Sequence, residues 1–230
     1  MKVGTDGLLL GAWPKLEGAQ RILDVGTGSG LVALMAAQRA PGAEVTAIEL
    51  EPFAAAQARE NFASSPFADR LHLIEADALS WSVASTSAWD VILCNPPFFR
   101  GKPKSPDSAR NLARHDDSLP IEGLFASFDR LAAASGKIYI VWPMDRLEDL
   151  REAGRTCRWH EHQRLSIHGT PGQPAERVIS VWSKATPDAL AEVALTIEVE
   201  PFSTSGTPDR TVEFKQLMAP FMARYADYAQ

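Results

Sequence analysis

Residues Asn95, Pro96, Pro97 and Phe98 place rigid hydrogen-bond acceptors beside an aromatic ring. Two consecutive prolines fix φ and remove two backbone N–H donors, so the carbonyl oxygens of Asn95 and Pro96 are held in place as acceptors. The side-chain carbonyl of Asn95 adds a further acceptor. Acceptors that bind both hydrogens of a ring-bound NH₂ group favour a pyramidal nitrogen whose lone pair points at an electrophile. Phe98 adds a face on which a flipped-out base can stack, worth roughly 1–3 kcal/mol, and we predict that the four residues form a catalytic corner.

A glycine-rich turn, DVGTGSG at residues 24–30, follows a strand-like run and precedes a helix-like run. Glycines let the backbone turn tightly and approach a ligand without a Cβ clash. Dinucleotide-binding oxidoreductases use GxGxxG, whereas the spacing from Gly26 is GxGxG, with the third glycine one residue early. That spacing disfavours an NAD enzyme and resembles the turn of S-adenosylmethionine (SAM) methyltransferases. The residues of the turn that we expect to contact this cofactor are Asp24, Gly26, Thr27, Gly28 and Gly30.

Carboxylates follow the next two predicted strands, where a nucleoside would be recognised. Glu49 ends the second strand, 23 residues after Gly26, and can accept hydrogen bonds from both hydroxyls of a ribose. Asp77 follows the third strand, where a carboxylate can bind the amino group of an adenine. Ligands of open α/β sheets bind at the carboxyl ends of the strands, and the glycine turn, Glu49 and Asp77 all fall at that edge. The agreement predicts one nucleoside site.

The elements that must position these residues alternate between apolar strands and helices over the first two thirds of the chain. The predicted strands span 21–25, 44–50, 71–75, 89–94 and 137–142, and the predicted helices span 31–39, 53–63 and 118–135. Strands that are apolar on both faces and separated by helices imply a parallel sheet covered on both sides. Residues 177–182 and 195–200 are predicted to add antiparallel strands at a C-terminal edge, before a final helix near 214–222. The predicted fold is an α/β, Rossmann-like three-layer sandwich with a mostly parallel sheet.

Five segments carry a resemblance to a known family. They are KVGTDGLLLGAW (2–13), ILDVGTGSG (22–30), AIELE (47–51), ENFASSPFADRLHLIEAD (60–77) and NPPFF (95–99). Together they resemble the bacterial tRNA(Val) (adenine-N6)-methyltransferase family, a branch of the class I SAM-dependent methyltransferases that acts next to the anticodon. The resemblance implies the class I SAM-methyltransferase fold, SAM as cofactor with S-adenosylhomocysteine as product, and tRNA as substrate.

The same resemblance implies how the chain is divided. It indicates a single methyltransferase domain over 1–230, with a substrate- and cofactor-covering segment at 1–18, a core at 19–184 and a C-terminal strand and helix at 185–230. The further cofactor contacts that it implies are Lys2, Thr5, Leu50, Ala78 and Asn95. Relatives carry a leading segment before the KVGTDG motif, and we expect that segment to help cover the cofactor.

One departure from the family pattern leaves the acceptor open. The family usually has NPPY, whereas this chain has NPPF, a form that rRNA guanine-N2 methyltransferases also carry. Stacking survives the change but a hydroxyl is lost, so adenine and guanine are both candidate acceptors. A glutamine-N5 protein methyltransferase would use a similar corner on a protein. A SAM-binding RNA chaperone would keep the glycine turn without needing Asn95.

The charge of the chain bears on an RNA partner. With 29 acidic and 23 basic residues the net charge is −6, which excludes a uniformly basic nucleic-acid binder. The 15 residues from 100 to 114 reverse the sign, with five basic residues against Asp107 alone. The predicted RNA-binding residues are Arg100, Lys102, Lys104, Arg110 and Arg114, and Arg164 and Arg177 are candidates to extend the patch. We expect binding to bulk RNA to be weak and salt-sensitive, with selection by the pocket.

Other site classes are disfavoured by composition. Cys94 and Cys157 are too few for a disulfide framework or a four-ligand zinc site. The WHEH segment at 159–162 is more typical of alternation on a strand or a loop than of a metal site, so we predict no metal. Residues 1–7 lack the apolar core of a signal peptide, and no apolar run approaches the roughly 20 residues of a membrane helix. The expected location is the reducing cytoplasm.

Overall fold

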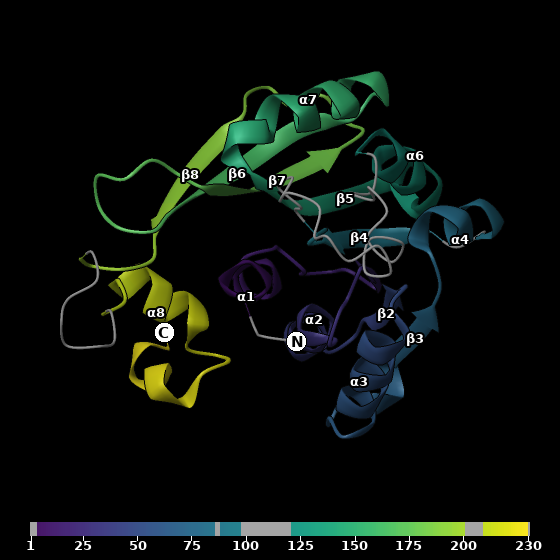
Figure 1. Cartoon of the computed structure of the whole chain (residues 1–230), viewed down its shortest axis with the longest axis horizontal. Coiled ribbons are helices and arrows are strands. Elements are labelled where there is room, and N and C mark those ends of the chain that lie inside the picture. The colour runs from purple at the N-terminus through teal and green to yellow at the C-terminus, as the bar shows by residue number, and fades with distance from the viewer. Residues whose placement is uncertain (1–3, 86–87, 98–120, 201–208, 230) are drawn as a thin grey trace, which may run out of the picture.

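Eight strands form one sheet, in the order β3-β2-β1-β4-β5-β7-β6-β8, within residues 4–85, 88–97, 121–200 and 209–229, which the computed structural model describes (Figure 1). The strands are β1 (Arg21–Val25), β2 (Glu44–Glu49), β3 (Leu71–Glu75), β4 (Trp89–Cys94), β5 (Ala132–Pro143), β6 (His160–His168), β7 (Arg177–Ser183) and β8 (Ala191–Thr196). The α-helices are α1 (Thr5–Ala12), α2 (Leu31–Arg39), α3 (Pro52–Ala63), α4 (Ala78–Ala84), α6 (Ile121–Leu131), α7 (Leu147–Thr156) and α8 (Val212–Met218). Short 3₁₀ helices are η1 (Ala68–Arg70), η2 (Met144–Arg146) and η3 (Ala223–Tyr228).

The N-terminal strands pair in parallel, as their two-sided apolar pattern predicts. β1 pairs with β2 on one side and with β4 on the other, β2 pairs with β3, and β4 pairs with β5. The predicted bounds of β1, β3 and β4 are confirmed, and β2 ends one residue early at Glu49. A parallel sheet must be covered on both faces, because βαβ connections place a helix over each crossover.

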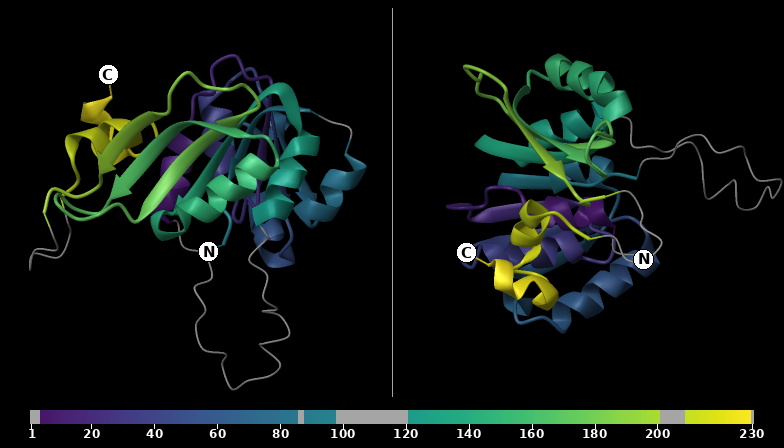
Figure 2. Two further views of the ribbon diagram at one scale, coloured as in Figure 1. Left: turned by 90° about the horizontal axis from the view of Figure 1, so that it is seen from above. Right: turned by 90° about the vertical axis from the view of Figure 1, so that its left-hand side faces the viewer.

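Alternate residues of the strands face two separate hydrophobic cores. Ile22 of β1 lies in the core covered by α1, α2, α3 and α8, whereas Leu23 lies in the core covered by α4, α6 and α7. This alternation follows from the two-residue side-chain period of a strand. α8 lies beside α1 and β8, and η3 packs on α8 (Figure 2). The layers therefore form the three-layer α/β sandwich that the sequence predicts.

The boundary between α6 and β5 differs from the prediction of a helix over 118–135. α6 ends at Leu131, and β5 begins at Ala132. β5 pairs with β4 through a register irregularity between Trp89 and Val91. A Cβ atom on Gly136 would lie 2.7 Å from the carbonyl oxygen of Trp89. Gly136 thus permits the close approach of two strands and does not end a helix.

The prediction of an antiparallel C-terminal edge is wrong in its detail. β7 is antiparallel, but it lies inside the sheet between β5 and β6. The edge strand is β8, which runs parallel to β6. The polar residues at 160–164, in the sequence HEHQR, left a strand and a loop both open, and the structure shows that they begin β6.

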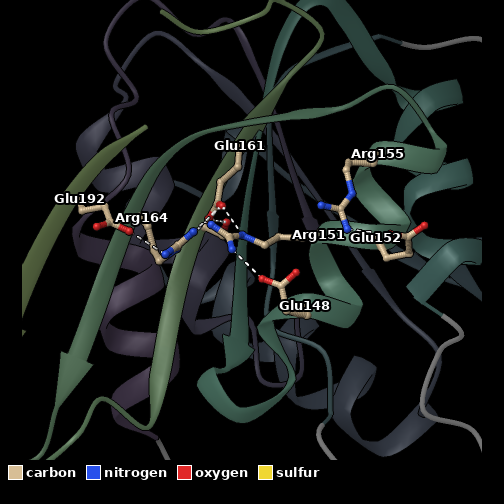
Figure 3. Close-up of polar contacts among 8 residues, drawn as sticks. Glu148, Arg151, Glu152, Arg155, Glu161, Arg164 and Glu192 are labelled. Atoms are coloured by element: carbon tan, nitrogen blue, oxygen red, sulfur yellow. Dashed lines mark hydrogen bonds and ion pairs between the residues drawn. The ribbon is translucent and has the colours of Figure 1, made fainter. Parts of the chain in front are cut away.

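A buried ion network explains those polar residues and joins α7 to the last three strands (Figure 3). The guanidinium of Arg164 lies 2.7 Å from a carboxylate oxygen of Glu161 and 2.7 Å from one of Glu192 in β8. Arg151 of α7 and the hydroxyl of Ser180 in β7 also donate to Glu161, at 3.2 and 2.5 Å. Burial alone would raise the pKa of Glu161, but hydrogen bonds from Arg164 and Ser180 hold it below its usual value. Arg164 is only 7% exposed, so its suggested place in an RNA-binding patch is wrong.

Helix α1, which the sequence did not predict, packs closely on α2. Gly7 and Gly11 lie one turn apart and face α2. A Cβ atom on Gly11 would lie 2.5 Å from Sδ and 2.9 Å from Cβ of Met35. A Cβ atom on Gly7 would only touch Leu31 and Val32, at 3.8 and 3.9 Å. The absence of a side chain at Gly11 therefore sets how closely α1 approaches α2.

We predict that Gly11→Ala lowers the free energy of unfolding by about 1–3 kcal/mol, because Cβ of Met35 cannot rotate away from the added methyl group. This net loss remains after the roughly 1 kcal/mol by which alanine stabilises a helix relative to glycine. Chemical denaturation measures the change. Gly42→Ala is the matched control, because nothing lies within 4 Å of its Cβ position. Equal stabilities of the two variants would contradict this packing.

Candidate active site

The predicted site residues that the structure describes meet at one edge of the sheet. The glycine turn follows β1, Glu49 ends β2, Asp77 follows β3 and Asn95 follows β4. These four strands are neighbours and parallel, so their carboxyl ends lie side by side. Val25 is paired with Cys94, so the glycine turn and the Asn95 corner begin one strand apart, about 5 Å in distance.

The glycine turn has backbone angles that favour glycine at three positions. The φ values of Gly26, Gly28 and Gly30 are 71°, 59° and 85°, all in the left-handed region. A Cβ atom on Gly30 would also lie 2.5 Å from a ring carbon of Phe62 in α3. Nothing lies within 4 Å of the Cβ position of Gly26, which leaves open space beside the exposed backbone. The turn is therefore shaped so that a ligand can approach its backbone.

The carboxylate of Glu49 fixes this turn against the end of β2. One oxygen accepts a 2.7 Å hydrogen bond from the N–H of Gly28, and the other accepts from the N–H groups of Leu50 and Glu51 at 3.0 and 2.9 Å. A carboxylate has about four acceptor positions, so these three bonds leave room for a ribose hydroxyl. The Gly28 contact spans 21 residues of sequence and was not predicted. It places the ribose-binding candidate and the glycine turn in one rigid unit.

Asp24 lies inside the turn and not on its open side. It is 1% exposed, and its carboxylate accepts from the hydroxyl of Thr27 at 2.5 Å and from the N–H of Ala33 at 3.2 Å. Burial, and to a lesser extent the charge of Glu49, raises its pKa from 3.8 to about 7, despite the hydrogen bonds from Thr27 and Ala33. Asp24 thus connects β1, the turn and the first turns of α2.

Asp77 has a structural role that was not predicted, as the N-cap of α4. Its carboxylate accepts from the N–H groups of Leu79 and Ser80, at 3.2 and 3.3 Å, and so caps the N-terminus of α4. Its contact with an adenine stays a prediction. Of the neighbouring cofactor candidates, Ala78 is buried, whereas Leu50 is 64% exposed beside Glu49.

The acceptor corner lies against helix α1. Asn95 is half-buried, Pro96 is buried and Pro97 is exposed. A Cβ atom on Gly7 would lie 3.9 Å from Nδ2 of Asn95, so the first turn of α1 covers the Asn95 side chain. Thr5, one of the cofactor candidates, is partly exposed in this same turn. α1 therefore touches the acceptor corner while it packs on the helix that follows the glycine turn.

Several predicted residues lie outside the described part of the chain. They are Lys2, Phe98, Arg100, Lys102, Lys104, Arg110 and Arg114. Arg177, a candidate extension of the basic patch, lies at the site edge, where it begins β7 and pairs with Asp6 of α1 at 3.4 Å.

Other ligand classes find little support among the described residues. They contain no group of three potential metal ligands among His, Cys, Asp and Glu. Cys94 and Cys157 are both free thiols. Over the same ranges, every helix is too short or too polar to cross a membrane.

Relatives with assigned activities cover most of the chain. The family model described as the methyltransferase small domain matches residues 3–123, more than half of the chain. A tRNA1(Val) (adenine(37)-N6)-methyltransferase of Porphyromonas gingivalis is 42% identical over 192 residues, which cover 80% of this chain and 75% of the relative. A protein of the same name from Serratia proteamaculans is 36% identical over 226 residues, 98% of this chain and 85% of the relative.

Solved structures of methyltransferases share the fold. A predicted O-methyltransferase from Agrobacterium tumefaciens matches with a TM-score of 0.69 and 20% identity, over 94% of this chain and 95% of the other. The glycopeptide N-methyltransferase MtfA in complex with SAM matches with a TM-score of 0.54 and 14% identity, over 74% of this chain and 89% of the other. At these identities the likeness concerns the fold alone, and it confirms the expected class I SAM-methyltransferase architecture.

We predict that Asp24→Asn removes a pH dependence of stability. The pKa of Asp24 is higher in the folded chain, about 7, than in the unfolded chain, so the folded state binds more protons between about pH 4 and pH 7. The contribution of this group to stability is therefore largest at low pH and declines as pH rises toward 7. Asparagine accepts the same two hydrogen bonds without a charge, so the melting temperature of the variant should rise relative to that of wild type as the pH increases from about 4 to about 7.

The matched control is Asp90→Asn, because that more exposed carboxylate also accepts two backbone hydrogen bonds, from Gln20 and Arg21. Melting curves recorded across the same pH range compare the two variants. A difference between wild type and Asp24→Asn that stays constant with pH would contradict the buried, proton-binding carboxyl.

Proposed function

Because this chain belongs to the tRNA1(Val) (adenine(37)-N6)-methyltransferase family within the methyltransferase small domain, we propose that it methylates N6 of the adenine next to the anticodon of a tRNA. The chain is a SAM-dependent methyltransferase by family and fold. The observation that best supports the acceptor class is the adjacency of the glycine turn after β1 and the Asn95 corner after the paired strand β4. A methyl donor and an amino acceptor bound there would lie next to each other.

The residues present fit SAM at this edge. The backbone of the glycine turn is open at Gly26, and a carboxylate with remaining acceptor capacity stands beside it at Glu49. SAM supplies an electrophilic methyl group on its sulfonium and leaves as S-adenosylhomocysteine. We assign one ribose hydroxyl to the remaining acceptor position of Glu49 and the adenine amino group to Asp77. Thr5, Leu50 and Ala78 are assigned to the walls of the same site, as part of a single methyltransferase domain.

The acceptor corner orients the nucleophile. The side-chain carbonyl of Asn95 and the backbone carbonyl of Pro96 accept the two amino hydrogens and turn the nitrogen lone pair toward the methyl carbon. A base held in this geometry is already oriented for reaction, so no further entropy is lost in the chemical step. The acceptors also stabilise the positive charge that develops on nitrogen. The methylated nitrogen then releases a proton to water, so the reaction needs no dedicated general base. Phe98 is assigned to stacking on the flipped-out base.

The basic residues of 100–114 are assigned to RNA phosphates. They directly follow the corner at which the base enters, and their local charge is opposite to that of the whole chain. A tRNA substrate also leads us to propose a cytoplasmic location. The second candidate activity is rRNA guanine-N2 methylation, which the NPPF form of the corner favours.

Mass spectrometry of digested RNA from a deletion strain separates these activities. The proposed function predicts that N6-methyladenosine disappears from tRNA and returns when the gene is restored. Loss of N2-methylguanosine from rRNA, or of methylglutamine from a protein, would overturn it in favour of the alternatives.

We predict that Asn95→Ala lowers kcat on the order of 100-fold and leaves the Kd for SAM within a factor of two of wild type. The reason is that the side-chain carbonyl is needed by the amino group in the transition state and not by the bound cofactor. Glu49→Gln is the contrasting variant and should weaken SAM binding, because Glu49 is assigned to the ribose. Single-turnover kinetics and calorimetry measure the two effects. An equal loss of kcat and SAM affinity in Asn95→Ala would assign Asn95 to the cofactor.

Phe98→Ala should raise the KM for RNA about 10-fold through the loss of base stacking, with the KM for SAM unaltered. Phe98→Tyr is the matched control, because it keeps the aromatic face and should stay close to wild type. Steady-state methylation of tRNA transcripts measures both constants. Unchanged use of RNA by Phe98→Ala would remove the stacking role.

A further inference from the structure

A small cavity opens at the site edge beside the first turn of helix α1, where Thr5 lies in its wall. It has a volume of about 200 Å³ and lies between the first turn of α1 and the ends of β6, β7 and β8. Its lining includes Asp6, Ile167, Glu176, Arg177 and Ile197. Pockets that hold whole drug-sized ligands measure roughly 300–1,000 Å³, so this one suits a single ring system.

The cavity lies next to the acceptor corner. Asp6, in its wall, precedes Gly7, whose Cβ position is 3.9 Å from the amide nitrogen of Asn95. Arg177 is paired with Pro143 of β5, so β7 lies two strands, about 10 Å, from β4 and its corner. A group bound in the cavity would therefore neighbour a base held at Asn95.

The guanidinium of Arg177 is held in a defined orientation. Its Nε lies 3.4 Å from a carboxylate oxygen of Asp6, and its Nη1 donates to the backbone carbonyl of Glu176 at 3.0 Å. Its side chain is 30% exposed, so part of it can be reached from the solvent. Planar guanidinium groups stack on nucleic-acid bases and donate to their edges.

The charges of the lining select against a phosphate. Asp6 and Glu176 are two carboxylates against the single guanidinium of Arg177. Carboxylates accept from the N–H groups of a heterocyclic ring, and the buried Ile167 and the half-buried Ile197 add apolar walls. A neutral, planar ring with N–H donors matches this combination better than an anion does.

We propose that this cavity receives the base of a nucleotide that flanks the methylated one, so that Asp6, Glu176 and Arg177 determine sequence context in the RNA. This inference rests on the proposed function. The base stacks on or bonds to the guanidinium of Arg177 while its N–H groups donate to the carboxylates. Binding there would draw the strand across α1 and present the neighbouring base to the Asn95 corner.

Kinetics with modified RNA test this subsite. The substrates are an anticodon stem-loop RNA and two versions in which the nucleotide on one or the other side of the acceptor is abasic. For the wild-type enzyme we expect one of the abasic positions to raise the KM for RNA about 10-fold. Arg177→Met should raise the KM for intact RNA by a similar factor, lose the sensitivity to the abasic position, and keep the wild-type KM for SAM.

Further variants separate a base contact from other roles. Arg177→Lys keeps the charge but not the planar group, so it should behave like Arg177→Met if the ligand is a base. Glu176→Gln, at an exposed position where folding is not at risk, should also raise the KM for RNA. Arg155→Met is the matched control, because Arg155 forms an exposed ion pair with Glu152 on α7, away from the cavity.

Three results would overturn the inference. Rescue by Arg177→Lys would indicate a phosphate, and an equal rise in the KM for SAM in Arg177→Met would indicate that the pair with Asp6 only holds α1 in place. Normal methylation of both abasic RNAs by the wild type would exclude the subsite while leaving the proposed function intact. Failure to methylate even the intact RNA and full-length tRNA would refute the proposed function as well.

Discussion

The hydrogen bond from the N–H of Gly28 to the carboxylate of Glu49 joins the ends of β1 and β2, two of the four strands from which the site is built. It works together with Asp24, which holds the same turn from inside through Thr27 and Ala33. The turn therefore has its left-handed glycine conformations fixed from both sides before a ligand binds. Because the paired strands β1 and β4 are in register, this anchoring also fixes where the acceptor corner lies relative to the cofactor turn.

Helix α1 connects the glycine turn, where we propose that the cofactor binds, with the Asn95 corner, where we propose that the RNA base binds. Gly11 brings it close to α2, and Gly7 lies next to Asn95. Its first turn also reaches β7 through the pair between Asp6 and Arg177. Such exposed ion pairs contribute roughly 0–1 kcal/mol, so the apolar face of α1, with Leu9 and Leu10 fully buried, holds the helix in place.

The sequence predicts the parallel half of the fold closely because hydrophobic pattern alone decides it. β1 and β4 are largely buried apolar runs with clear ends, β3 is a partly buried edge strand, and the predicted bounds of all three are confirmed. The C-terminal half is different, because β6 carries Glu161 and Arg164, whose burial is made favourable by partners on α7, β7 and β8. Pairing of that kind is a tertiary property and leaves no periodic signal in the chain.

The sequence predicts that the site residues lie at one edge of the sheet, but it does not predict the hydrogen bonds and packing contacts among them. Residue type and spacing place the glycine turn, Glu49, Asp77 and Asn95 at the carboxyl ends of four strands. The capping of α4 by Asp77 had a local signal, because an aspartate directly before a helix is typical of an N-cap. The long-range contacts of Glu49 with Gly28 and of Gly7 with Asn95 had no such signal, since they depend on strand register and helix packing.

The central claim, that a methyl group passes from SAM to an adenine amino group held at the Asn95 corner, is tested most directly by isotope transfer. The purified chain would be incubated with SAM carrying a deuterated methyl group and with an unmodified valine tRNA transcript, and the digested nucleosides would be identified by mass spectrometry. The account predicts label in N6-methyladenosine and none when the adenine next to the anticodon is replaced. Label in N2-methylguanosine, or SAM turnover with no labelled RNA, would contradict it.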